Sequence, residues 1–229
     1  MKKLNISIMI LSFFCHPILA QMLSNVEAIE SGGSLTQYNM IGKERPAPEV
    51  KGDYYLFEDW VVADLSLAID KTIKGQQLNL NLQDGDIEIP YGENVRILNR
   101  EKIKLFTVDN RNFINARYIE GVNNKDAFLE IMEKGRIKVY CQYYSDVRPP
   151  TYVPGLAVGD RNYKILIKET YYIQWGSSFE IFSNDKKRNI KYFEGDQLTS
   201  EFIRKEKLRM NKIADFLEAT RFYNNRHPD

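Results

Sequence analysis

The sequence has few of the side chains that carry out most enzyme chemistry. It contains two cysteines and two histidines in 229 residues, and Cys15 and His16 lie within the first twenty. If that segment is removed, Cys141 and His227 remain, so no intramolecular disulfide can form. His227 lies two residues from the C-terminus, where chains are usually frayed. We therefore expect no histidine in an ordered pocket.

This scarcity excludes several classes of functional site. Ser-His-Asp and Cys-His nucleophilic sites need a positioned imidazole, and most zinc and iron sites use His and Cys ligands. The sequence also lacks the GxxxxGK[ST] phosphate loop, a GxGxxG fingerprint after a strand, and the GxSxG nucleophile turn. We expect no catalytic residues, no metal ligands and no cofactor, and a protein that is not an enzyme.

Long apolar runs and an excess of one charge are also missing. A transmembrane helix needs about 20 apolar residues, and no segment after residue 20 has that length without interruption. Lys+Arg total 32 and Asp+Glu total 31, whereas a nucleic-acid-binding surface needs clustered basic residues. We expect no nucleic-acid partner and no transmembrane span in the chain that follows residue 20.

What is present is a segment typical of export. Lys2 and Lys3 precede the apolar run 6–14, and Ala20 ends the segment. This order is typical of a secretory signal peptide over residues 1–20, cleaved after Ala20. The apolar run is short for an uncleaved membrane anchor, which is therefore disfavoured. A lipid-anchored Cys15 is also disfavoured, because bulky phenylalanines precede it where a small residue is needed. We expect transport across the inner membrane, to the periplasm or to an outer-membrane-associated position.

The chain then divides into three parts by pattern. Residues 21–50 are rich in Gly, Ser and Pro and predict an extended lead-in, to which Leu35–Ile41 could add an edge strand. Residues 51–183 alternate with a period of two. They predict a mainly β (α+β) fold, formed by an antiparallel sheet, a sandwich or an open barrel of consecutive hairpins. The period changes near Asn184, and residues 184–229 predict C-terminal helices packed on or beside the sheet.

One hairpin and one buried thiol stand out within the β region. Residues 77–82 alternate leucine with an amide, Asp84-Gly85 follows, and residues 86–89 alternate again. This pattern predicts a hairpin; a calcium loop at Asp84-Gly85-Asp86 would need further acids at fixed spacing. Cys141 shares its alternation parity with Ile137 and Val139, which predicts a buried core thiol.

The helical part carries its own start signals. Asp185, Thr199 and Asn211 can each serve as the N-cap of a helix. In the last of these helices, apolar residues recur at 3.6-residue spacing, as expected for a face that packs against the sheet.

A proline-rich loop and exposed aromatic residues are the candidate partner-binding features. The loop 146–157 is long for a hairpin, and long loops are often functional; a surface loop without a partner is the alternative. Tyr and Trp favour protein interfaces and sugar stacking, although aromatic residues also pair across strands. The candidate partner-binding residues are Pro149, Pro150, Tyr152, Pro154 and Trp175.

Three stretches carry a resemblance to a known group. They are residues 52–60 (GDYYLFEDW), residues 128–135 (FLEIMEKG) and a tail that includes Phe222-Tyr223-Asn224. Together they resemble a group of secreted, β-rich proteins of the Bacteroidota that has no established activity. The resemblance covers roughly residues 52–225. It implies a secreted or periplasmic location and a β-rich fold, and it carries over no catalytic residue.

Three functions are compatible with the sequence. The leading hypothesis is a non-enzymatic, secreted cell-envelope protein that binds a protein partner, as an accessory subunit of an outer-membrane assembly or secretion complex. The second is a glycan- or peptidoglycan-binding module that uses exposed Tyr and Trp. The third is a carboxylate-dependent hydrolase, for which Glu58 and Asp59 beside Trp60 are the candidate acids.

Overall fold

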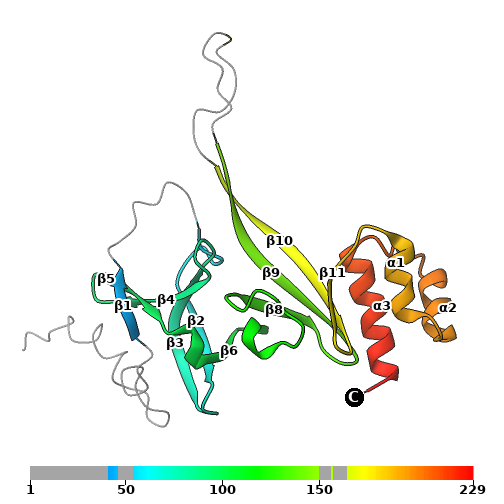
Figure 1. Cartoon of the computed structure of the whole chain (residues 1–229), viewed down its shortest axis with the longest axis horizontal. Helices are drawn as coiled ribbons and strands as arrows, with labels where there is room; N and C mark the ends of the chain where they lie inside the picture. The colour runs from blue at the N-terminus through cyan, green and yellow to red at the C-terminus, as the bar shows by residue number, and fades with distance from the viewer. Residues whose placement is uncertain (1–40, 46–53, 150–155, 157–163, 229) are drawn as a thin grey trace, which may run out of the picture.

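The described residues form a long antiparallel sheet with helices at one end. A computed structural model describes residues 41–45, 54–149, 156 and 164–228 (Figure 1). The strands are β1 (Ile41–Arg45), β2 (Val61–Leu67), β3 (Thr72–Asn81), β4 (Asp86–Tyr91), β5 (Asn94–Leu98), β6 (Ile103–Val108), β7 (Arg111–Asn115), β8 (Phe128–Glu133), β9 (Ile137–Arg148), β10 (Lys164–Trp175) and β11 (Ser178–Ile181). Their order across the sheet is β1-β5-β4-β3-β2-β6-β7-β8-β9-β10-β11. The predicted mainly β fold is confirmed, and its architecture is an open antiparallel sheet.

The predicted hairpin is formed by β3 and β4. Asn81 lies opposite Asp86 in the register, and the Gly85 N–H donates to the Asn81 carbonyl at 2.8 Å. Gly85 has a φ of 70°, which glycine adopts without the strain that a side chain brings. A Cβ at this position would lie 2.9 Å from the Asp126 carbonyl oxygen. The turn therefore requires glycine for two separate reasons.

One strand of the lead-in joins the sheet. β1 pairs with β5, with Ile41 opposite Leu98 and Arg45 opposite Val95. β1 begins at Ile41, the last residue of the edge strand expected over Leu35–Ile41, and residues 35–40 lie outside the described residues. Short 3-10 turns, η3 (Arg100–Lys102) and η4 (Ala116–Tyr118), connect β5 to β6 and follow β7.

Two large hydrophobic cores stabilise the two ends of the sheet. The first lies under β2, β3, β6 and β7, where the rings of Phe106 and Phe113 stack at 4.6 Å and Phe128 packs against Phe106. The second joins the inner ends of β9 and β10 to the helices, around Phe193 and Phe216. Each buried aromatic ring removes about 150–250 Å² from water, so both cores contribute strongly to stability.

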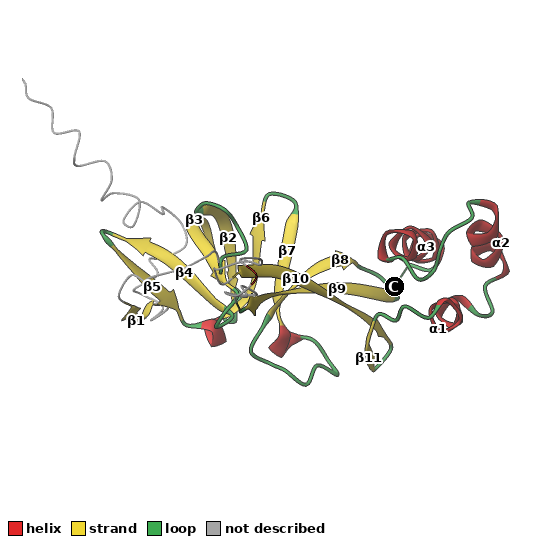
Figure 2. Ribbon diagram, turned by 90° about the horizontal axis from the view of Figure 1, so that it is seen from above, coloured by secondary structure: helices red, strands yellow, loops and turns green. Residues whose placement is uncertain are grey.

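The C-terminal helices gather at one end of the sheet (Figure 2). They are α1 (Lys186–Ile190), α2 (Gln197–Lys205) and α3 (Ile213–Arg226), with a 3-10 turn η6 (Lys191–Phe193) after α1. In the part of the chain that the structure describes, none of the helices combines the length and hydropathy needed to cross a membrane.

One of the three predicted helix caps is correct. Asp185 caps α1 by accepting the Lys187 N–H. The prediction of Thr199 for α2 is wrong, because Asp196 is the cap and accepts the Thr199 N–H at 3.0 Å. The prediction of Asn211 for α3 is also wrong. Lys212 occupies that position without a side-chain cap.

Asn224 joins α3 to the sheet. Its side-chain oxygen accepts the Ile137 N–H at 3.0 Å, and its amide nitrogen donates to the carbonyls of Lys134 and Ile137 at 2.9 and 2.8 Å. Gly135, in the turn between β8 and β9, has a φ of 123° and lies directly against Asn224. One amide side chain thus satisfies three backbone groups of the β8–β9 turn.

His227 is ordered, so the expected frayed position is wrong. Its Nε2 lies 2.5 Å from a carboxylate oxygen of Asp196, and its ring lies 4.5 Å from that of Tyr223. Arg226 donates to both oxygens of the same carboxylate, at 2.8 and 3.1 Å. The end of α3 and the start of α2 are thereby joined through Asp196.

Candidate functional site

The outer half of the β9–β10 hairpin projects beyond the rest of the sheet (Figure 1). β8 pairs with β9 up to Cys141, and β11 pairs with β10 from Tyr172 onward. Beyond these points β9 and β10 pair with each other to Arg148 and Lys164. We call residues 143–148 and 164–169 the arm. An isolated two-stranded hairpin is marginally stable in water, so the arm needs further contacts to be well ordered.

The two faces of the arm differ in character. Val147 lies opposite Ile165, and Ile167 lies opposite Ser145; we call the surface made by Val147, Ile165 and Ile167 the apolar face. Val147 and Ile167 are 47% and 42% exposed. A strand normally buries its apolar face and leaves its polar face in water, so this face has the pattern of a surface that something covers.

The other face of the arm mixes charged and apolar side chains. Lys164 lies opposite Arg148, Leu166 opposite Asp146, and Lys168 opposite Tyr144. Leu166 and Tyr144 are 36% and 38% exposed. Asp146 pairs with Lys168 and, at 3.5 Å, with Arg148. These hydrogen bonds, above all the one from Lys168, lower the pKa of Asp146. The Asp146–Lys168 pair crosses from β9 to β10, whereas the Asp146–Arg148 pair lies within β9. Both favour contact with water at these positions.

A polar network anchors the base of the arm. Arg111 donates to both carboxylate oxygens of Glu130 at 2.9 Å, and the Tyr143 hydroxyl donates to Glu130 at 2.6 Å. Burial disfavours the charged carboxylate, but the hydrogen bonds from Arg111 and Tyr143 outweigh it and lower the pKa of Glu130. Burial together with the bond to Glu130 raises the pKa of Tyr143. The network holds Tyr143 at the junction of arm and sheet.

Cys141 is the buried thiol that the alternation predicts. It is fully buried on β9, opposite Glu130 on one side and Tyr171 on the other. Burial raises the pKa of the thiol to about 12. Since the thiolate is the reactive form, the burial of Cys141 and its raised pKa both disfavour reaction at this thiol.

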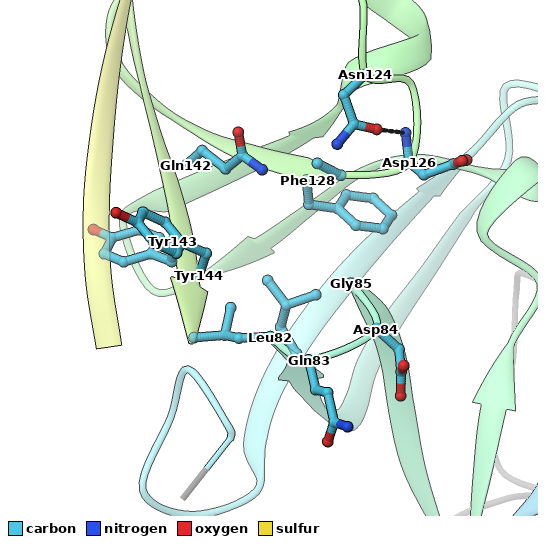
Figure 3. Close-up of a pocket in the computed structure, with 12 residues that line it drawn as sticks. Leu82, Gln83, Asp84, Gly85, Asn124, Asp126, Phe128, Gln142, Tyr143 and Tyr144 are labelled. Carbon is cyan, nitrogen blue, oxygen red and sulfur yellow. Dashed lines mark hydrogen bonds between the residues drawn. The ribbon is translucent and has the colours of Figure 1, made fainter. Parts of the chain in front are cut away.

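A cavity of about 310 Å³ lies at the foot of the arm (Figure 3). It is on the side of β9 away from β10, between the start of β8 and the β3–β4 turn. The lining residues are Leu80, Leu82, Gln83, Asp84, Gly85, Asn124, Asp126, Ala127, Phe128, Gln142, Tyr143 and Tyr144. Its volume is near the lower end of the range for ligand pockets, about 300–1,000 Å³. A single large side chain matches it better than a cofactor.

The predicted partner-binding residues do not form one site. Pro149 is exposed directly after β9, while Pro150, Tyr152 and Pro154 lie outside the described residues. Trp175 is at the opposite end of the twelve-residue β10. At about 3.3 Å per residue, the strand separates the arm tip from Trp175 by roughly 36 Å.

Trp175 borders a second cavity, of about 350 Å³, with Arg136, Lys138 and Gln174. The register places Trp175 opposite Ile137, and Gln174 opposite Lys138. Neighbouring residues of a strand face opposite sides, so the indole points to the helix side, where its ring lies 5.9 Å from that of Tyr192. The indole and Lys138 therefore start from opposite faces of the hairpin, although both residues border this cavity.

The other candidate groups lie apart from the arm. Glu58 and Asp59 are exposed just before β2, and neither lines the cavity at Tyr143 or the one at Trp175. Within the part of the chain that the structure describes, no group of three or more His, Cys, Asp or Glu side chains is placed to hold a metal ion.

Sequence reasoning missed the arm and the cavity. The alternating pattern of residues 137–144 and 163–175 predicts two strands, but it does not reveal that the neighbouring strands stop before these do. One partial signal was available, since the pattern of residues 163–175 predicts a much longer strand than the patterns of residues 128–132 and 179–182 do.

Comparisons with protein-family models, with curated proteins and with solved structures found no match to this chain.

Proposed function

We propose that this chain is a non-enzymatic, secreted cell-envelope protein that acts by binding a protein partner through its arm. The observation that carries the proposal is the apolar face of Val147, Ile165 and Ile167, on which the described residues leave Val147 and Ile167 47% and 42% exposed. Covering it would remove apolar surface from water, a gain of about 25 cal/mol per Å², and would stabilise a hairpin that is marginal alone. The signal peptide expected from the sequence is the reason for placing the protein in the cell envelope.

Within that compartment, an accessory role in an outer-membrane assembly or secretion complex fits best. The arm is a projecting element anchored by a polar network and a large core, an arrangement suited to reaching into a larger assembly. The glycan alternative has weaker support, because Tyr152 lies outside the described residues and the Trp175 indole packs toward Tyr192.

Co-purification from native envelopes tests the proposal. The tagged full chain is compared with a double variant, Val147→Thr with Ile167→Thr, which keeps β-branched side chains but makes the apolar face polar. The matched control is Val62→Thr with Ile181→Thr, because both residues are 59% exposed on strands away from the arm. We expect the arm variant to recover at least tenfold less partner than the wild type and the control. Equal recovery by both variants, or no partner with the wild type, would overturn the proposal.

A further inference from the structure

The edge of β9 that faces β8 is open along the arm. β8 begins at Phe128, and in its antiparallel pairing with β9 the pair nearest the arm is Glu130 opposite Cys141. Among the described residues, no strand continues along that edge from Tyr144 to Arg148. An unpaired strand edge presents a row of backbone donors and acceptors that can pair with another chain.

The cavity lies at the foot of this open edge. Phe128, Leu80 and Leu82 give it an apolar lining, and Tyr143 and Tyr144 border it from β9 (Figure 3). The Gln142 side-chain oxygen accepts from Tyr172 at 3.1 Å, which leaves its amide nitrogen as a donor beside the cavity. A chain that ran along the β9 edge would arrive directly at this opening.

The rim of the cavity is polar. Asp84 and Asp126 are exposed lining residues. Two arginines lie beside the rim, since Arg117 pairs with the Asp126 carboxylate at 3.3 Å and Arg100 donates to the Asp126 carbonyl at 2.6 Å. The negative charge at the rim is therefore balanced locally, and the apolar lining is the feature that selects a side chain.

From these observations we infer that the arm binds an extended segment of its protein partner by strand addition to β9. The segment lies antiparallel to β9, in the place that a longer β8 would occupy. It inserts one aromatic or large aliphatic side chain into the cavity. In this mode, main-chain hydrogen bonds supply affinity and the side-chain pocket supplies specificity. The inference rests on the proposed function and names the class of partner.

The size of the arm favours a segment over a second folded copy of the chain. Six residues per strand at about 3.3 Å each, on two strands about 4.8 Å apart, give a face of roughly 200 Å². A stable interface between folded proteins buries about 800 Å² on each partner. An extended segment compensates for the small face because it also gains backbone hydrogen bonds and a filled cavity.

Selection from a phage-displayed library of random ten-residue peptides on the full chain tests this inference. We expect enriched peptides to share an aromatic or large aliphatic residue at one position. The cavity variant is Asn124→Trp, since Asn124 lines the opening. The matched control is Asn123→Trp, one residue earlier in the same loop and also exposed. A synthetic enriched peptide should bind the Asn124→Trp protein at least tenfold more weakly, and the control within twofold of the wild type.

Two results would overturn the inference. One is no enrichment above that obtained on the Asn124→Trp protein, and the other is equal peptide affinity for the two tryptophan variants. Failure here is distinguishable from failure of the proposed function. A native partner that is lost with the Val147 and Ile167 substitutions but retained by Asn124→Trp would keep arm binding and reject strand addition at the cavity.

Discussion

Replacing Asn224 with alanine should loosen the attachment of α3 to the sheet. The side chain makes three hydrogen bonds to the backbone of Lys134 and Ile137, at 2.8 to 3.0 Å, and is 6% exposed. Ile137 is fully buried, so water cannot replace the lost acceptor of its N–H group. The β8–β9 turn would then have one orphaned donor at its centre.

The size of the effect follows from the groups left behind. A buried donor without a partner costs about 1–3 kcal/mol. The Ile137 carbonyl, which is also buried, loses the Asn224 donor and adds to this cost. The Lys134 carbonyl belongs to an exposed residue and can bond to water, so its loss adds little. We therefore expect Asn224→Ala to lower the free energy of unfolding by about 2–4 kcal/mol. This is a large share of the roughly 5–15 kcal/mol typical of a folded domain.

Urea unfolding followed by tryptophan fluorescence and circular dichroism measures this change. The matched control is Asn225→Ala, the next residue of the same helix, which is exposed and should change stability by no more than about 0.5 kcal/mol. Asn224→Asp should be at least as harmful as alanine, because it places a carboxylate against two carbonyls. A loss below about 1 kcal/mol for Asn224→Ala, or one equal to the control, would refute the reasoning.

Two further predictions concern carboxylates. Glu130 and Asp196 have pKa values below their ordinary 4.5 and 3.8, so the unfolded chain takes up protons first as the pH falls. The free energy of unfolding should be constant above about pH 5 and decrease below pH 4.5. Urea titrations from pH 6 to 3 measure this, and the free energy of unfolding of Glu130→Gln should decrease less than that of the wild type. The same decrease in both proteins would contradict the prediction. Asp196→Ala removes the α2 cap and its pairs with Arg226 and His227, and should cost on the order of 2 kcal/mol in thermal or urea unfolding. A cost within error of zero would show that the Asp196 contacts are not stabilising.

Much of the fold could be predicted because local pattern and tertiary burial agree in it. The alternation of residues 77–82, the Asp84-Gly85 turn and the parity of Cys141 all lead directly to observed strands and buried faces. The helix caps show where local signals fail. Thr199 and Asp196 both suit an N-cap, and Asp196 is selected because Arg226 and His227, about thirty residues later, converge on its carboxylate.

The candidate site was harder to predict because it, too, depends on contacts between residues that are far apart in the sequence. Alternation reports which residues share a face, but it does not report whether another layer packs on that face or whether neighbouring strands flank the hairpin. The apolar face of the arm has the pattern of any half-buried strand, and the early ends of β8 and β11 leave the two edges of the arm without a partner strand among the described residues. The cavity likewise depends on Leu82, Phe128 and Tyr143 meeting from three separate parts of the chain.

The central claim is that a protein partner covers the apolar face of the arm in the cell envelope. Site-specific photo-crosslinking in intact cells tests it most directly, with a photoreactive amino acid placed at Val147 in one strain and at Val62 in another. The account predicts an adduct of one discrete size from position 147 and none from position 62, where the side chain is at least as exposed. No adduct from position 147, or the same adducts from both positions, would contradict it.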